Sequence, residues 1–290
     1  MRNFGWFVFS LVNLGQVLID QVEANYGYTA ENGPDTWTGQ CQSGDLQSPI
    51  DIPYNYDHLK RRDDWLPFQW LDYNIEPHKM YIENDGHTAI VTFDPNSCHH
   101  IPTVVQGELP GSFQLAQIRF HWGDYGDDGS EHQLFGVRTR TFGLFFVKWV
   151  TSILIFILQN QFDAEMQLIH FNTKCGNTME DAILQCPTEA LAPMAIFIKE
   201  SGGDNKAFDS IIEGLKHIKH QGQKTYIKPF PLAKLLPRDV DEFFRYDGSM
   251  TYPDCLENSV WTVFKVCVCN DLTKFLKNFI RDFFSHFRIT

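Results

Sequence analysis

Two apolar segments of the chain each carry polar side chains whose types could serve metal binding or proton transfer. The first runs from Gln117 to Gly123 and reads Gln-Ile-Arg-Phe-His-Trp-Gly. Residues two apart on a strand project from the same face, so Arg119 and His121 point together. In the second segment Glu165 and Gln167 share a face for the same reason. A lone histidine in an apolar strand is usually a core residue with a satisfied hydrogen bond, so His121 alone does not define a site.

These segments belong to a pattern of short strands separated by turn signals. The strands alternate or run apolar, and Asn84-Asp85-Gly86 supplies a hairpin-type turn between the first two. One helix is expected over Ala207 to His220, where apolar residues recur at helical spacing. The sequence therefore predicts a mainly β (α+β) domain with few helices. The expected strands are Met80 to Ile82, His87 to Phe93, Phe113 to Trp122, Ala164 to Phe171, Leu191 to Lys199 and Val260 to Val268.

The composition is that of a globular protein with room for a sizeable core. The chain has 290 residues, of which 43% are hydrophobic and 21% charged, and this excludes a disordered or collagen-like chain. No internal repeat or low-complexity linker divides it. Thirty-six acidic residues against 24 Lys and Arg give a net charge of −12, and no basic block is present to grip phosphates. A nucleic-acid partner is therefore not expected.

The first 24 residues read as a signal peptide. Arg2 gives a positive start, Phe4 to Leu18 is mostly apolar, and Val22-Glu23-Ala24 ends in the small residue that signal peptidase accepts. The apolar run is short for a membrane span of about 20 residues. We expect a secreted protein whose single domain covers residues 25–290. Seven cysteines agree with an oxidising compartment, and their odd number leaves at least one outside an intrachain pair.

A series of motifs, taken in order, resembles the α-class carbonic anhydrases over about residues 26 to 266. The resemblance implies their fold, a large, mostly antiparallel, twisted central sheet with a few peripheral helices. The motifs are Tyr28 with Asn32-Gly33-Pro34 and Trp37, Gln47 to Ile52, Asp85-Gly86-His87, Phe120 to Gly123, Gly129 to His132, Leu168 to Asn172, Tyr246 to Thr251 and Trp261.

In that family three histidines hold a zinc ion that activates a water for attack on CO₂. Carried over residue by residue, the three ligand positions fall on Arg119, His121 and Gln167. An arginine stays protonated and has no lone pair to offer, and a glutamine oxygen is a poor substitute for imidazole on zinc. We therefore expect no zinc and no other cofactor. The pattern Arg, His, Gln resembles the acatalytic carbonic-anhydrase-related proteins.

The resemblance also assigns roles around the ligand positions. His87 falls on the proton shuttle, and Thr251 with Glu131 on the pair that orients the zinc-bound hydroxide. Gln117 and Glu165 match partners that fix the ligand imidazoles. Without zinc, ion pairs from Arg119 to Glu131 or Glu165 would supply the electrostatic centre of the cleft. The apolar wall for CO₂ maps to Ile169, Met250 and Trp261, while Pro193 and Tyr252 depart from the common residues and would reshape the pocket.

The motifs around Leu168 and Tyr246 look most like the secreted branch of those related proteins. Members of this branch are thought to bind other proteins, so the resemblance implies a partner that is an extracellular or cell-surface protein. Cys41 and Cys255 match the disulfide that secreted family members use. The pairing of the remaining cysteines stays open, and so do the partner's identity and the oligomeric state.

Two segments break the resemblance. Residues 137–160 form an insert whose centre, 142–158, is almost wholly apolar, with Lys148 as its one charge. It is either untranslated sequence retained in a gene model, which we favour, or a genuine apolar loop. After about residue 266 the family pattern is lost, and Cys267 to Thr290 has the composition of a helix. Three rival interpretations remain: a zinc hydratase in which His132 or another nearby histidine rescues the metal site, a membrane protein anchored by residues 142–158, and a defective product with no function.

Overall fold

The computed structural model describes residues 26–28, 30–52, 66–94, 100–123, 129–134, 162–200 and 206–270. The expected signal peptide, the insert at 137–160 and the C-terminal residues 271–290 lie outside these ranges, so the expectations about them are not tested by the fold. Among the described helices, none is long and apolar enough to cross a membrane.

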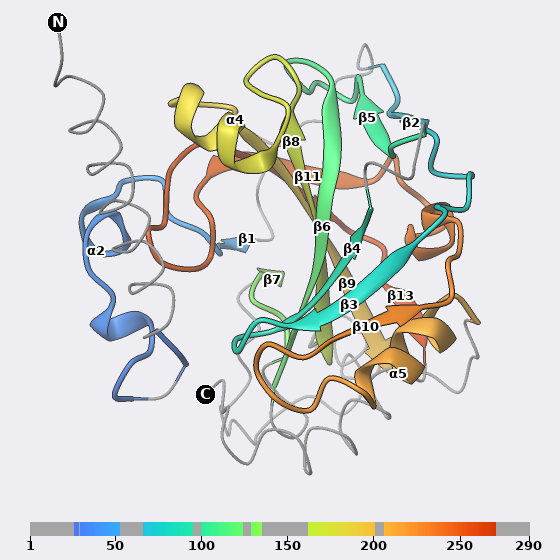
Figure 1. Cartoon of the computed structure of the whole chain (residues 1–290). Helices are drawn as coiled ribbons and strands as arrows, with labels where there is room; N and C mark the ends of the chain where they lie inside the picture. The colour runs from blue at the N-terminus through green and yellow to red at the C-terminus, as the bar shows by residue number, and fades with distance from the viewer. Residues whose placement is uncertain are drawn as a thin grey trace, which may run out of the picture.

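Strands dominate the described residues, as the sequence predicts, and the helices are short (Figure 1). The helical elements are η1 (Pro34–Thr36), α2 (Gln40–Ser43), α4 (Met179–Gln185), η3 (Lys206–Phe208), α5 (Asp209–Leu215) and η4 (Leu232–Leu235). The strands are β1 (Asp51–Ile52), β2 (Gln69–Leu71), β3 (Met80–Asn84), β4 (Ala89–Phe93), β5 (Thr103–Val105), β6 (Phe113–Trp122), β7 (Gln133–Leu134), β8 (Ala164–Asn172), β9 (Leu191–Glu200), β10 (Lys224–Ile227), β11 (Phe243–Gly248), β12 (Ser259–Phe264) and β13 (Val268–Asn270).

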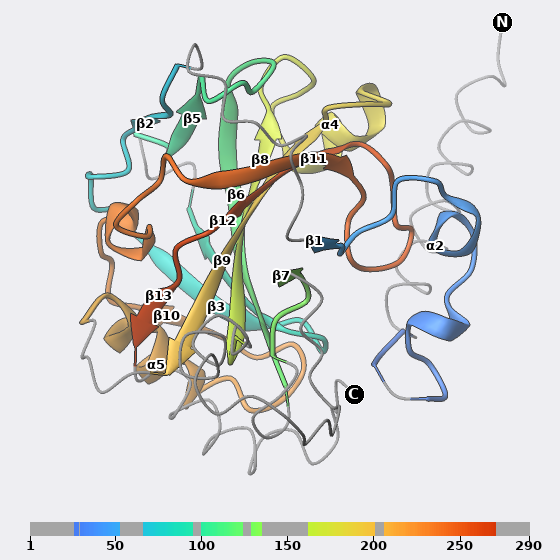
Figure 2. The ribbon, with the colours of Figure 1, turned by 180° about the vertical axis from the view of Figure 1, so that it is seen from behind.

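One large sheet of 11 strands organises the domain. Its main path runs β10-β3-β4-β6-β8-β9-β12-β11, and most neighbours along it are antiparallel. Strand β9 is the exception, because it pairs in parallel with both β12 and β13. The long central strands β6 and β8 cross the middle of the sheet, with α4 near one end and α5 near the other (Figures 1 and 2). This arrangement confirms the predicted sheet with few peripheral helices.

The pairing of β6 with β8 is what brings the polar residues of the two segments together. Arg119 lies directly opposite Gln167, and His121 lies opposite Glu165. The register shifts between Leu115 and Gln117, so β6 carries an irregularity just before the polar residues. All nine residues of β8 are buried. The three ligand positions expected from the resemblance, Arg119, His121 and Gln167, therefore lie on two adjacent strands.

Apolar side chains cover both faces of the sheet. The largest cluster lies between the sheet and α5, where Ile211 and Leu215 pack with Ile82 and Ile227. Two smaller clusters lie elsewhere, one around Trp261 and one in which α4 packs on the strands. Burial of this extent provides the main driving force for folding, because each large apolar side chain contributes about 1.5–3 kcal/mol when fully buried.

Two predicted elements differ from the observed ones. The helix expected over Ala207 to His220 shortens to α5, because 3-10-type bonds such as the one from His217 N to Gly214 O close its last turn. The single strand expected over Val260 to Val268 is divided into β12 and β13. Residues 268–270 were expected to belong to a helix that begins at Cys267. They form the strand β13 instead, which pairs with the end of β9.

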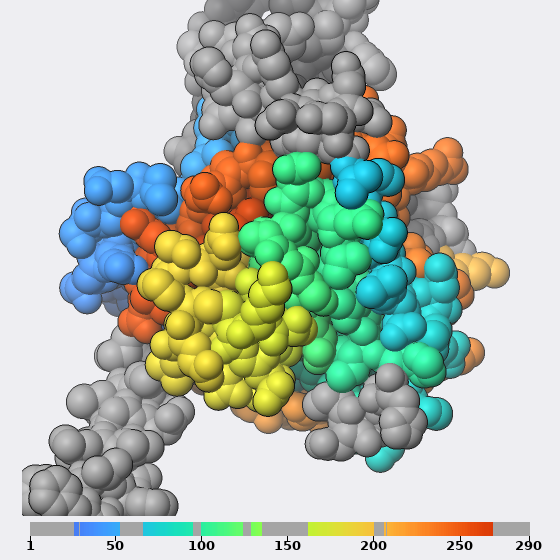
Figure 3. Space-filling model, turned by 90° about the horizontal axis from the view of Figure 1, so that it is seen from above, coloured from blue at the N-terminus to red at the C-terminus, as the bar shows by residue number. Residues whose placement is uncertain are grey.

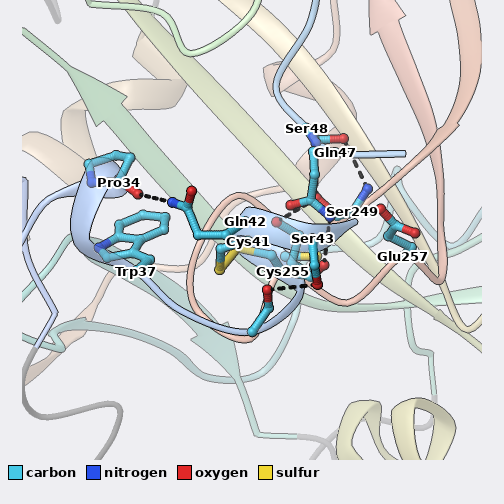
Figure 4. The surroundings of a disulfide bond; sticks show 12 residues. Pro34, Trp37, Cys41, Gln42, Ser43, Gln47, Ser48, Ser249, Cys255 and Glu257 are labelled. Carbon is cyan, nitrogen blue, oxygen red and sulfur yellow. Dashed lines mark hydrogen bonds between the residues drawn. A yellow bond between two sulfur atoms is a disulfide. The ribbon is translucent and has the colours of Figure 1, made fainter. Parts of the chain in front are cut away.

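A disulfide ties the N-terminal entry of the domain to the loop between β11 and β12. Cys41 on α2 is bonded to Cys255, which confirms the expected pair (Figure 4). Gln47 adds to this connection by donating hydrogen bonds to the Cys255 carbonyl and to Glu257. Figure 3 shows the N-terminal segment in blue lying directly against the orange loop. A second disulfide, Cys175–Cys186, closes the segment that contains α4, and the sequence had left its pairing open.

Candidate functional site

Arg119 forms an ion pair with Asp85, whose carboxylate accepts from the guanidinium at 2.8 Å. Asp85 occupies the turn between β3 and β4, where its other oxygen accepts from the backbone N–H groups of His87 and Thr88. The Arg119 side chain is only 7% exposed. The expected pairing of Arg119 with Glu131 or Glu165 is therefore wrong, because the turn holds a carboxylate closer to the guanidinium and each glutamate has another partner.

The ring of Tyr252 covers the Arg119 guanidinium, whose central carbon lies 4.4 Å from the ring centroid. Burial by itself lowers the pKa of Arg119, but nearby Tyr252 and Asp85 outweigh it and hold the pKa above its usual value. Such a cation–π contact is strongest where water is excluded, as it is here. Arg119 is thus a permanent cation in the centre of the site.

His121 and Gln167 are joined by Glu131. The Nδ1 atom of His121 lies 3.0 Å from one oxygen of Glu131, and the Gln167 amide donates to the other oxygen at 2.8 Å. Burial by itself lowers the pKa of His121, but the charge of Glu131 and its hydrogen bond raise the pKa above the ordinary value. Glu131 therefore uses both oxygens on two of the three positions where the family resemblance expects metal ligands.

A second buried carboxylate, Glu165, anchors a chain of hydrogen bonds. It accepts from the His132 backbone N–H at 2.9 Å and contacts the Nδ1 of His132 at 2.8 Å. The Nε2 of His132 lies 2.6 Å from the Tyr246 hydroxyl, which donates to Ser48. Both ring nitrogens of His132 are therefore engaged inside the protein. Gly129 allows its segment to lie against the start of β8, because a Cβ atom at this position would lie 1.8 Å from the Asp163 carbonyl oxygen.

Glu165 also contacts Gln167, whose amide donates to it at 2.9 Å. Burial by itself raises the pKa of Glu165, but His132 and His121 lower it to about 2. The carboxylate therefore stays ionised across the physiological range. Glu165 therefore contacts the side chain at the third ligand position, which is an amide where the family resemblance expects an imidazole.

Thr251 does not form the expected hydrogen bond with Glu131. Its Oγ1 atom is buried and has no hydrogen-bond partner among the described residues. The two oxygens of Glu131 contact other side chains, one His121 and the other Gln167. Buried polar atoms without a partner also occur at His121 Nε2 and Gln167 Oε1 in the part of the chain that the structure describes.

The remaining positions lie in two apolar clusters and on β6. Ile169, opposite Pro193 in the sheet, belongs to the same cluster as Met250. Trp261 belongs to a different cluster and donates from its ring to the Ser249 carbonyl, next to Met250. Gln117 lies half-buried on β6, opposite Ile169.

The donor set does not fit zinc. Arg119 has no lone pair for a metal and already carries a positive charge at the ligand position. Gln167 directs its amide N–H groups at two carboxylates. His121 is therefore the one imidazole of the three positions. Within the ranges described, no group of three His, Cys, Asp or Glu side chains is arranged to hold a metal ion.

Sequence comparison decides the family. The profile of the eukaryotic-type carbonic anhydrases matches residues 32–149 and 156–277. The chain belongs to the carbonic anhydrase family. The matched ranges include part of the insert at 137–160 and extend past residue 266, beyond the last motif found in the sequence.

Individual carbonic anhydrases are related to the chain at about 30% identity. Putative carbonic anhydrase 5 of Caenorhabditis elegans is 32% identical over 82% of this chain and 67% of its own length. Carbonic anhydrase 12 of Homo sapiens is 29% identical over 83% of this chain and 60% of its own length. Carbonic anhydrase 15 of Mus musculus is 33% identical over 80% of this chain and 65% of its own length. The chain thus spans about two thirds or less of these carbonic anhydrases.

Three residues of the site were not predicted from the carbonic anhydrase resemblance. Asp85 was part of a quoted motif, but nothing in the sequence gave it the role of partner to Arg119. Tyr246 also lay in a motif, and its hydroxyl proves to be the second partner of His132. Tyr26 gave no signal, because its place beside His87 depends on how the N-terminal segment crosses the domain.

Proposed function

We propose that this member of the carbonic anhydrase family is acatalytic, and that it is a secreted protein that binds other proteins. The observation that carries the first part is the Arg119–Asp85 ion pair at the first of the three ligand positions. A guanidinium replaces the metal ligand at this position. It carries a fixed positive charge, is held by a carboxylate and is covered by Tyr252.

Electrostatics supports this proposal. Two unit charges of the same sign repel by several kcal/mol at short range near a protein surface, and by more where water is excluded. A zinc dication beside Arg119 would meet this repulsion with His121 as its one imidazole ligand. His87, Glu131 and Thr251 are retained from the catalytic pattern, but in the family they act on a hydroxide that the metal generates. Without the metal there is no hydroxide for these three residues to act on.

The rival function, a zinc hydratase rescued by His132, receives no support from the geometry. His132 contacts Glu165 through one ring nitrogen and Tyr246 through the other. Metal binding would need one of these nitrogens to be released, which would leave a buried partner without its hydrogen bond. Such a loss costs about 1–3 kcal/mol.

Secretion is supported by the N-terminal sequence and by two disulfides, which persist in oxidising compartments. The role in protein binding rests on the resemblance to the acatalytic relatives. Expression of the full chain in a secreting cell line would test the export step: the secreted protein should begin near Asn25 and carry the Cys41–Cys255 bond. Retention inside the cell, or export with residues 1–24 attached, would contradict it.

Restoration of the ligand set tests the acatalytic proposal. The double variant Arg119→His with Gln167→His should gain zinc binding and measurable CO₂ hydration in a stopped-flow assay. Arg119→His alone serves as the matched control, because it removes the cation but leaves an amide at the third position. The proposal would be wrong if the unmodified protein hydrated CO₂ as fast as the double variant and lost that activity on chelation.

A further inference from the structure

Positive charge is concentrated in residues 206–238 of an otherwise acidic chain. This stretch contains seven Lys and Arg residues against two acidic residues, a net charge of +5, whereas the rest of the chain carries 17 against 34, a net charge of −17. The basic residues are spread singly along the stretch, so they form no run in the sequence. All seven are exposed, and they are Lys206, Lys216, Lys219, Lys224, Lys228, Lys234 and Arg238.

The fold packs the elements of this stretch against one another. The short helix η3 contacts α5 and η4, and α5 also contacts β10. Phe208, Ile211 and Leu232 from these elements are buried in one apolar cluster, which leaves the charged side chains on the outside. Figure 1 shows α5 and β10 together at the end of the sheet away from α4. The separate cations therefore belong to one part of the surface.

Most of these cations have no acidic partner among the described residues. Lys216 pairs with Glu213, and Lys224 pairs with Glu83. The second acidic residue of the stretch, Asp209, is exposed and forms no ion pair with a described lysine or arginine. The cations left without an ion pair within the described ranges form the basic face, which consists of Lys206, Lys219, Lys228, Lys234 and Arg238.

A further lysine joins the basic face where β10 ends. Ile227 ends β10 opposite Met80, which begins β3. The next residues outward, Lys228 and Lys79, are both exposed and leave the paired strands side by side. The strand β4 contributes one carboxylate here, Asp94, whose N–H donates to the Lys79 carbonyl. Like charges placed opposite each other on neighbouring strands are destabilising, so the fold alone gives no reason for this pair.

We propose that the basic face binds a sulfated polysaccharide. Lysine is a compact charge that meets an anion without a fixed geometry, and six of the seven cations in the stretch are lysines. Base recognition and bidentate phosphate contacts favour arginine instead. An extracellular polyanion is chosen because we propose that the protein is secreted. Charges are screened beyond about 8 Å at physiological ionic strength, so acidic residues on other faces do not prevent this contact.

Binding of heparin to the purified full chain tests the proposal. In calorimetry at about 0.15 M salt the unmodified protein should bind heparin saturably, and its affinity should fall steeply as salt is added, because each contact releases counterions from the polyanion. Replacing Lys206, Lys228 and Lys234 together by alanine should weaken binding about a hundredfold, at about fivefold for each cation lost. All three side chains are exposed, so the melting temperature should stay unchanged.

Lys228→Glu and Lys174→Glu are a matched pair, because each reverses the charge of one exposed lysine. Lys174 lies between β8 and α4, away from the basic face. Lys228→Glu should weaken heparin binding at least about fivefold, and Lys174→Glu less than about twofold. Equal effects of the two variants would show that only net charge matters and would overturn the proposal, as would the absence of saturable heparin binding.

Two further probes test the source of the anionic groups. Polyuridylic acid and phosphatidylserine vesicles should each bind at least about tenfold more weakly than heparin at the same salt concentration. Binding of either probe as tightly as heparin would overturn the assignment to a polysaccharide. These assays use purified protein and need neither export nor zinc, so a failure of the proposed secretion and a failure of heparin binding are separate results.

Discussion

Replacing Glu165 by glutamine tests the buried network beneath the site. The carboxylate is fully buried and accepts hydrogen bonds from the His132 backbone, the His132 ring and the Gln167 amide. An amide in its place would present N–H groups to at least one of these donors. The change also removes the negative charge that faces His132, so we expect a large loss of stability.

Two lines of reasoning give a similar magnitude for this loss. Leaving a buried donor without its acceptor costs about 1–3 kcal/mol, and more than one donor depends on the Glu165 carboxylate. The pKa of Glu165 is lowered from 4.5 to about 2, and at 1.36 kcal/mol per unit this shift corresponds to about 3 kcal/mol of stabilisation. Because the pKa is lowered in the folded state, the stabilisation is complete above about pH 5 and declines as the pH falls towards 2. About 2 kcal/mol of it should be gone at pH 3.

Urea unfolding followed by circular dichroism measures both effects. Glu165→Gln should be destabilised by about 3 kcal/mol at pH 7, and the difference from the unmodified protein should shrink to about 1 kcal/mol at pH 3. Glu83→Gln is the control, because Glu83 is a partly exposed carboxylate paired with Lys224, and its loss should cost no more than about 0.5 kcal/mol. A Glu165→Gln protein within 1 kcal/mol of the unmodified one at pH 7 would refute the reasoning.

Three further predictions concern other parts of the fold. Burial lowers the pKa of His170 to about 4, so its ring should stay neutral in an NMR titration until well below pH 6. Because the unfolded chain takes up this proton more readily, His170 makes the free energy of unfolding fall as the pH drops from about 6.5 towards 4. Titration of the ring near pH 6.5 would contradict the burial. Replacing Cys41 and Cys255 together by serine should lower the free energy of unfolding by about 2–5 kcal/mol, measured against the reduced and oxidised unmodified protein, and a change below 1 kcal/mol would contradict a structural role for the bond. Deleting residues 137–160 should raise the soluble yield, because it removes a long apolar segment, whereas loss of folding would assign that segment to the core.

Much of the sheet was predictable because its strands carry their signal locally. Phe113 to Trp122 was predicted with the observed bounds, since its alternating and apolar residues suit a buried strand flanked by turns. The helix near residue 211 was predicted too long, because apolar spacing continues to Ile218 although the backbone changes to 3-10-type turns. Strand β13 was not predicted as a separate element, because it is short and depends on pairing with β9, which is distant in sequence.

Less of the site could be predicted, because its contacts depend on tertiary geometry. The alignment of Arg119 with Gln167 followed from strand periodicity and the resemblance. The choice of Asp85 as partner of Arg119 did not, because three carboxylates were available and only the folded turn determines which one is near. The same holds for Tyr26, whose position depends on the path of the N-terminal segment across the domain. Residue types thus predicted the loss of zinc ligands, while the replacing contacts required the structure.

The central claim, that the three ligand positions do not form a zinc site, is tested most directly by the metal content of the purified protein. The unmodified chain should be incubated with excess zinc, separated by gel filtration and measured by atomic emission. We expect far less than one equivalent of zinc per chain, because Arg119 keeps its charge and its ion pair with Asp85. One equivalent of zinc that is lost from the Arg119→Met, His121→Ala and Gln167→Ala variants would contradict it.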